Sequence, residues 1–351
     1  MFSAISDPFL RIAAVAGAAA LALTLLIGIT ILGLRLHFRR EDRLWQDFVA
    51  AWRPALLAAM LSPQPARLPD LAARDHGRFL RLWTYLHESV RGESSERLNR
   101  VALDLYMDHS AREFLRHGSR AQQLQAILAA GYLKDRSAWD ALHAMARSSD
   151  GLVSVNAARA LIRIDALEGA QVLMPLILAR HDWDMTRVAA FLADARDAFW
   201  LLLIKGLPAL DPQDLPRALA LAEALRLQLP AATLRYLLDA QQPAEIAARA
   251  LRLAAAADLA PEVRALLSHP SPEVRQQAAL ALARLGGRDD VPRLAALLDD
   301  AQWPVRLAAA QALSALPFLS TGELQALQRE GGAAGDVLRH VVAERQWEAA
   351  A

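Results

Sequence analysis

Apolar residues recur along most of the chain at every third or fourth position, which is the spacing of one face of an α-helix. Helix signals bound these segments. Ser271 and Pro272 precede one of them, and Gly286 and Gly287 follow it. Helices are predicted over 41–62, 70–92, 98–107, 271–286, 291–298 and 336–347. The pattern therefore predicts an all-α protein.

One segment departs from this pattern because it is apolar on every face. Residues 12–34 carry no charged side chain, and as a helix they would be about 34 Å long, enough to cross a hydrocarbon core of ~30 Å. A cleaved signal peptide has a shorter apolar run that follows its basic residues. Here the basic cluster comes afterwards, at Arg35, Arg39, Arg40 and Arg43. The sequence predicts a single-pass helix in the inner membrane with the rest of the chain in the cytoplasm, and a periplasmic orientation is the alternative.

Small residues lie four apart within this segment, at Ala16, Ala20, Thr24 and Gly28. A stripe of small side chains lets a second membrane helix approach closely. We therefore expect this stripe to pack on another membrane protein or on a second copy of the chain. The alternative is chance, because alanine is abundant throughout the sequence.

A repeat of about 30 residues occupies the C-terminal part of the chain. Ser271-Pro272-Glu273-Val274-Arg275 begins one helix, and Trp303-Pro304-Val305-Arg306 begins the next in the same way. Ala-Leu pairs mark successive repeats, and their leucines are Leu161, Leu225, Leu251, Leu282 and Leu313, spaced by 64, 26, 31 and 31 residues. The first interval fits two repeats. A two-helix unit of this length predicts an α-solenoid, in which each unit buries its apolar face only against its neighbours.

Residues 266–313, LLSHPSPEVRQQAALALARLGGRDDVPRLAALLDDAQWPVRLAAAQAL, resemble HEAT repeats of the short bacterial form called PBS-lyase-like. The resemblance implies a ladder of ion pairs between repeats, in which an Asp ends one unit and an Arg six residues later begins the next. Asp300 and Arg306 fit that spacing, whereas His269 replaces the Asp before Arg275. The implied organisation is a short segment at 1–11, the membrane helix at 12–34, a helical juxtamembrane region at 35–110 with or without degenerate repeats, repeats at 111–330 and a capping helix at 331–351.

Composition narrows the function. The chain has no cysteine, which excludes disulfides, thiolate metal sites and cysteine nucleophiles. Its nine histidines form no short metal-ligand spacing, and no phosphate-binding or nucleophile motif occurs, so we expect no catalytic, cofactor or metal site. The 39 basic and 38 acidic residues nearly balance, which argues against nucleic-acid binding. Arg235 and Arg264 occupy equivalent repeat positions and are the candidate partner surface.

The sequence therefore predicts a non-enzymatic scaffold, an N-terminal transmembrane helix followed by a HEAT-type α-solenoid. We expect it to bind a protein partner at the membrane, with a glycosyltransferase or a signalling protein as candidate classes, and self-association as an alternative. The resemblance also implies a second class of function, the attachment or isomerisation of a bilin chromophore. Pull-down of the full-length protein separates the two classes.

Overall fold

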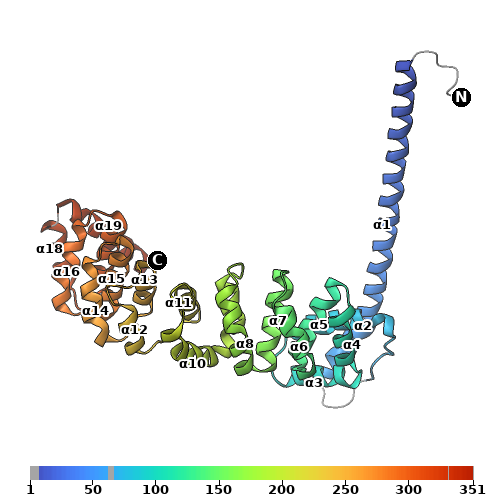
Figure 1. The fold of residues 1–351 in the computed structure, drawn as a ribbon, viewed down its shortest axis with the longest axis horizontal. Helices are drawn as coiled ribbons and strands as arrows, with labels where there is room; N and C mark the ends of the chain where they lie inside the picture. The colour runs from blue at the N-terminus through green and yellow to red at the C-terminus, as the bar shows by residue number, and fades with distance from the viewer. Residues whose placement is uncertain (1–7, 62–66, 331, 351) are drawn as a thin grey trace. The chain divides into compact units, whose positions relative to one another are not determined.

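The computed structural model describes residues 8–61, 67–330 and 332–350. All regular elements in these ranges are helical, and the ranges contain no strand. The chain divides into two compact units, residues 1–133 and 134–351 (Figure 1). The expectation of an all-α chain is therefore confirmed, and each unit is described by itself.

The first unit is built on a long helix. Its elements are α1 (Pro8–Leu61), a 3-10 turn (Ala73–Asp75), α2 (His76–Glu88), α3 (Glu93–Asp104), α4 (Met107–His117) and α5 (Arg120–Leu133). Trp52 and Phe79 pack edge to face, with ring centroids 5.2 Å apart. The Trp83 indole is fully buried and donates a hydrogen bond of 2.9 Å to the carbonyl of Leu98, which ties α2 to α3. The C-terminal part of α1 is thus held by an aromatic core.

The predicted transmembrane helix requires a correction. Residues 12–34 do not form an element of their own; they belong to α1, which continues into the charged segment that follows. Within the described residues no helix is long and apolar enough to cross a membrane. The assignments to a single-pass helix, to the inner membrane and to either orientation in it are therefore wrong by this criterion.

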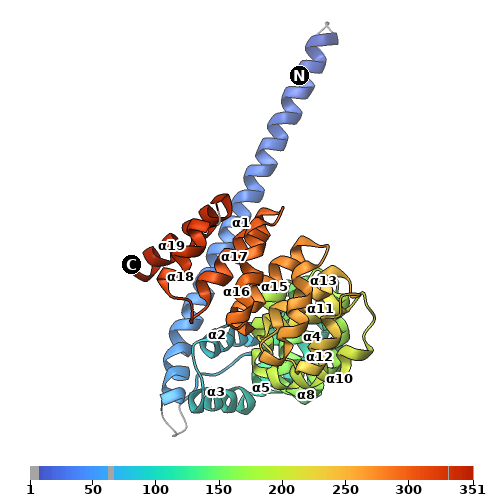
Figure 2. The same cartoon turned by 90° about the vertical axis from the view of Figure 1, so that its left-hand side faces the viewer.

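The second unit is a succession of helix pairs joined by short turns, several of them 3-10. Its α-helices are α6 (Trp139–Ala146), α7 (Gly151–Ile164), α8 (Ala166–Ala179), α9 (Met185–Leu192), α10 (Arg196–Gly206), α11 (Leu215–Ala224), α12 (Ala231–Leu237), α13 (Ala244–Leu253), α14 (Ala260–Ala265), α15 (Pro272–Leu285), α16 (Val291–Ala296), α17 (Trp303–Ala315), α18 (Thr321–Glu330) and α19 (Gly332–Ala350). Helices α13, α15 and α17 pack successively side by side (Figures 1 and 2).

Small residues allow these helices to approach one another. Ala278 and Ala279 in α15, and Ala308 and Ala309 in α17, are at most 1% exposed. At the crossing of α7 and α8, a Cβ on Gly169 would lie 3.1 Å from the backbone carbonyl of Leu161. Valine and leucine side chains fill the remaining space between units. No helix pair buries its apolar face alone, so the unit is stable only as a stack.

Candidate functional site

One bidentate contact between repeats joins Arg275 at the start of α15 to Asp300 before α17. The guanidinium donates two hydrogen bonds to the carboxylate, Nε to Oδ2 at 2.8 Å and Nη2 to Oδ1 at 2.9 Å. The Arg275 hydrogen bonds, more than any other cause, lower the pKa of Asp300 below its ordinary value. The same guanidinium donates to the carbonyls of His269 and Pro270, so it also closes the turn that precedes its own helix.

Arg306 makes the second of these contacts, the one that closes the turn before its own helix. Its guanidinium donates to the backbone carbonyls of Asp300, at 2.7 Å, and Ala301, at 3.2 Å. The structure thus brings all three ladder residues together, but the Asp300 carboxylate pairs with Arg275 of the preceding repeat. Arg306, six residues later, contacts the Asp300 backbone.

The two arginines predicted as a partner surface are paired within the chain. Arg264 binds Asp290 through two hydrogen bonds of 2.6 and 2.9 Å, and the Asp290 side chain is fully buried. These hydrogen bonds are the largest cause of a lowered pKa at Asp290. Arg235 likewise binds Glu262 and Asp258. Both guanidiniums therefore link neighbouring repeats.

A different contact replaces the Arg in the repeat that begins with α7. Ser154 occupies that position, and its buried hydroxyl donates to the carbonyl of Ala146 at 2.9 Å. The indole Nε1 of Trp183 donates to the same hydroxyl oxygen at 3.1 Å. The ion-pair ladder of the repeats contains no contact like this buried Ser–Trp pair. The sequence indicated it only by a serine at a position where the repeats have arginine.

The predicted small-residue stripe lies in α1. The side chains of Ala16 and Ala20 are outside the described residues. Thr24 and Gly28 are exposed, and a Cβ placed on Gly28 would meet no atom within 4 Å. The described part of the first unit therefore places nothing against Gly28.

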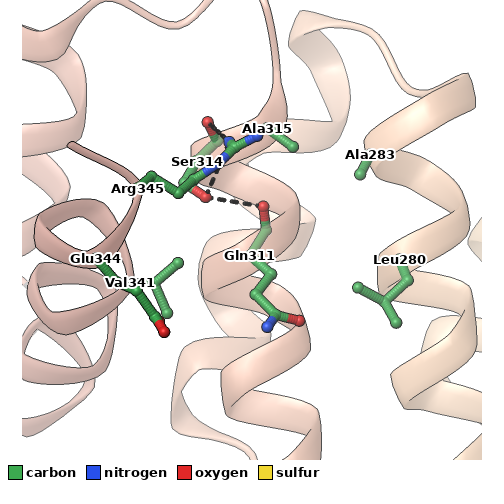
Figure 3. A pocket seen from close by; sticks show the side chains of 8 residues that line it. All are labelled: Leu280, Ala283, Gln311, Ser314, Ala315, Val341, Glu344 and Arg345. Carbon is green, nitrogen blue, oxygen red and sulfur yellow. Dashed lines mark hydrogen bonds between the residues drawn. The ribbon is translucent and has the colours of Figure 1, made fainter. Parts of the chain in front are cut away.

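Several cavities open on the described surface of the second unit, and two of them concern residues named above or below. The first, of about 360 Å³, lies between α15, α17 and α19, and Figure 3 shows its lining residues. Gln311 and Ser314 come from α17, and Glu344 and Arg345 come from α19. The Arg345 guanidinium donates to the carbonyl of Ser314 and, at 3.3 Å, to its hydroxyl.

The second cavity, of about 520 Å³, lies between α10 and the loop after α11. Trp200 and Leu201, which are 40% and 38% exposed, form its apolar part, together with Leu227. The Trp200 indole donates a hydrogen bond of 2.8 Å to the carbonyl of Gln228, which fixes the ring at the rim. Arg196 and Asp197 provide a polar edge.

The acidic and histidine side chains of the described ranges do not meet the requirements of a metal site. In the described ranges no group of three or more His, Cys, Asp or Glu side chains could hold a metal ion. The acidic residues Asp290 and Asp300 are both occupied by arginine partners. What the surface offers instead is open cavities with mixed apolar and charged linings.

Comparison with protein families identifies the repeats. The family model described as HEAT repeats matches residues 231–314, which extend from α12 into α17. A comparison with curated proteins gave no match. This part of the chain is therefore similar to HEAT repeats, a fold that generally serves as a non-enzymatic surface for protein interaction.

Proposed function

We propose that this protein is a non-enzymatic scaffold whose repeat surface binds a partner protein. The observation that carries the proposal is the HEAT-repeat match at 231–314, because such repeats commonly mediate protein–protein interaction. We propose further that the array extends through the preceding helix pairs, from residue 111, and ends at residue 330 with a capping helix at 331–351. Stacked repeats create an extended surface suited to a macromolecule.

The cavity at Trp200 is the surface best suited to anchor a partner. Tryptophan is enriched among the residues that contribute most to the binding energy of protein interfaces. Its contribution is large where apolar neighbours exclude water from it. Trp200 is held by its hydrogen bond to Gln228, so little side-chain entropy is lost when a partner covers it. Leu201 extends the apolar area, and the charged groups of Arg196 and Asp197 supply a polar rim.

The test is a pull-down of the full-length protein from its own cells, followed by mass spectrometry. Leu201→Glu places a charge in the cavity without removing the Trp200 hydrogen bond. The matched control is Leu167→Glu, because Leu167 is 50% exposed on α8, outside the cavity. We expect one protein to be enriched by the wild type and the control and lost with Leu201→Glu.

Two results contradict the proposal. If the two variants capture the partner protein equally, the Trp200 cavity does not bind it. Enrichment of a pigment or another small molecule, with no protein, refutes the scaffold function and favours the chromophore-attachment alternative.

A further inference from the structure

Arginines from one repeat close the ends of helices in the repeat before it. Arg284 of α15 donates from Nη2 to the carbonyls of Leu251, at 2.9 Å, Arg252, at 3.4 Å, and Ala254, at 3.2 Å. These carbonyls belong to the C-terminal end of α13, where the last turn leaves acceptors without helical partners. A guanidinium is well suited to this place, because its several donors match several carbonyls and its charge opposes the negative helix end.

Helix α17 is closed in the same manner. Arg345 of α19 donates to the carbonyl of Ser314, in the last turn of α17, and to the hydroxyl of the same residue. Helix α13 therefore receives a guanidinium from α15, and α17 receives one from α19.

The end of α15 lies between them and, in the described residues, receives no guanidinium from a following helix; its own Arg284 donates from Nη1 to the carbonyl of Leu280 at 3.3 Å. The residue 31 positions after Arg284 is Ala315, whose methyl group cannot reach the preceding helix. The carbonyl of Leu282 accepts a hydrogen bond of 2.7 Å from the Gly286 amide, which closes the helix from within its own chain segment. The space that an arginine side chain would fill is the cavity of about 360 Å³, whose walls include both Ala283 and Ala315 (Figure 3).

The charged groups around this cavity favour a cation. Glu344 lines it and, in the described part of the chain, forms no ion pair. Arg345 also lines it, but its guanidinium is directed to Ser314 in α17. The C-terminal end of α15 adds the partial negative charge of its last carbonyls. The cavity thus combines an unpaired carboxylate with a helix end that elsewhere in the array binds guanidinium.

We propose that the cavity between α15, α17 and α19 binds an arginine side chain of the partner protein, in the place that Arg284 fills one repeat earlier. The proposal rests on the scaffold function proposed above and gives it a recognition element. The partner's guanidinium donates to the terminal carbonyls of α15 and pairs with Glu344. Its methylenes lie against Leu280 and Val341, which form the apolar part of the wall.

The probe is N-acetylarginine amide, titrated into the full-length protein and followed by saturation-transfer-difference NMR. N-acetylcitrulline amide is the matched ligand, because it keeps the shape of arginine and lacks its charge. We expect saturable binding of the arginine probe, and binding about tenfold weaker for citrulline or for Glu344→Gln, the effect of losing one charge-assisted contact.

Ala315→Arg provides the decisive variant, because it supplies the chain's own guanidinium to the end of α15. We expect it to abolish probe binding and to raise the melting temperature. Ala240→Arg is the matched control, since it adds the same charge at an exposed position after α12, outside the cavity, and should change neither. Absence of saturable binding, equal binding of citrulline, or an unchanged affinity in Ala315→Arg overturns the proposal.

The two proposals fail separately. A partner protein captured equally by the wild type and Ala315→Arg refutes arginine recognition and leaves the scaffold function in place. Probe binding that Ala315→Arg abolishes, with no protein captured by any variant, refutes the scaffold function alone.

Discussion

Asp300→Asn tests how much the ion pair between repeats stabilises the array. The Arg275 and Asp300 side chains are 16% and 9% exposed, and two hydrogen bonds of 2.8 and 2.9 Å join them. The substitution keeps the size of the side chain and removes its charge, so Arg275 loses its counter-ion. A hydrogen bond to a charged group contributes about 1.5–3 kcal/mol, and partial exposure reduces the cost below that of breaking a fully buried pair. We expect a loss of about 2 kcal/mol.

Thermal unfolding followed by circular dichroism at pH 7 measures this loss. For a unit of about 200 residues, 2 kcal/mol corresponds to a decrease in melting temperature of roughly 4–8 °C. Asp336→Asn is the matched control, because Asp336 makes an equally short contact of 2.7 Å with Arg339 but both side chains are more than 60% exposed. We expect the control to shift the stability by less than about 0.5 kcal/mol. Equal shifts for the two variants would refute the reasoning, since burial would then make no difference to the pair.

Three further predictions follow from the same structure. Arg264 and Arg275 lower the pKa values of Asp290 and Asp300 in the folded state, so the stability that these pairs provide is complete above about pH 4 and is lost as the pH falls through the lowered pKa values. The acid unfolding curve of Asp290→Asn should therefore be less steep than that of the wild type. Identical unfolding curves would contradict this prediction. Ser154→Ala leaves the buried Trp183 indole without its acceptor and should cost about 1–3 kcal/mol in urea unfolding monitored by tryptophan fluorescence, whereas an unchanged midpoint would remove the role of this contact. Gly169→Ala places a methyl group 3.1 Å from the Leu161 backbone and should destabilise by about 1–3 kcal/mol in the same assay, while a gain in stability, as at an exposed helix position, would show that α7 and α8 can separate without cost.

The period of the repeat could be predicted from those positions at which packing allows only one size of side chain. The Ala-Leu pairs at 250–251, 281–282 and 312–313 are all fully buried. Alanine is needed where two helices cross closely, and leucine is needed where neighbouring units leave space. Because both requirements recur with each repeat, the sequence itself shows the period.

The pair at Ala224 and Leu225 was misassigned, which explains the short interval of 26 residues. Ala224 is exposed and is the last residue of α11. Leu221 is fully buried and stands 30 positions before Leu251, so it fits the repeat better. The segment around it, ALALAEALRL, contains three Ala-Leu pairs, and composition alone does not distinguish them. Burial of the leucine does not distinguish them either, because Leu219, Leu221 and Leu225 are all buried; the exposed alanine at 224 is what sets the last pair apart.

The candidate sites were less accessible to sequence reasoning, because they depend on contacts between repeats. Spacing along the chain placed Asp300 near Arg306, but the carboxylate turns to Arg275, 25 residues earlier. Arg235 and Arg264 share a repeat position, and that position faces the acidic residues of the following unit. A helical pattern shows which face of a helix is polar, and it leaves open which neighbour that face meets.

Two arginines of the second unit, Arg217 and Arg284, contact the ends of helices in a preceding repeat. Arg217 of α11 donates to three carbonyls around the end of α8, among them that of Trp183 at 3.1 Å, and Arg284 does the same for α13. Burial lowers the pKa of both guanidiniums, yet arginine keeps its charge at neutral pH, so the desolvation cost must be offset by these contacts. We therefore expect a helix end without such an arginine to contribute less to the stability of the stack than the helix ends beside it. The end of α15 is in this position, and a cation supplied from outside would both bind there and stabilise the array.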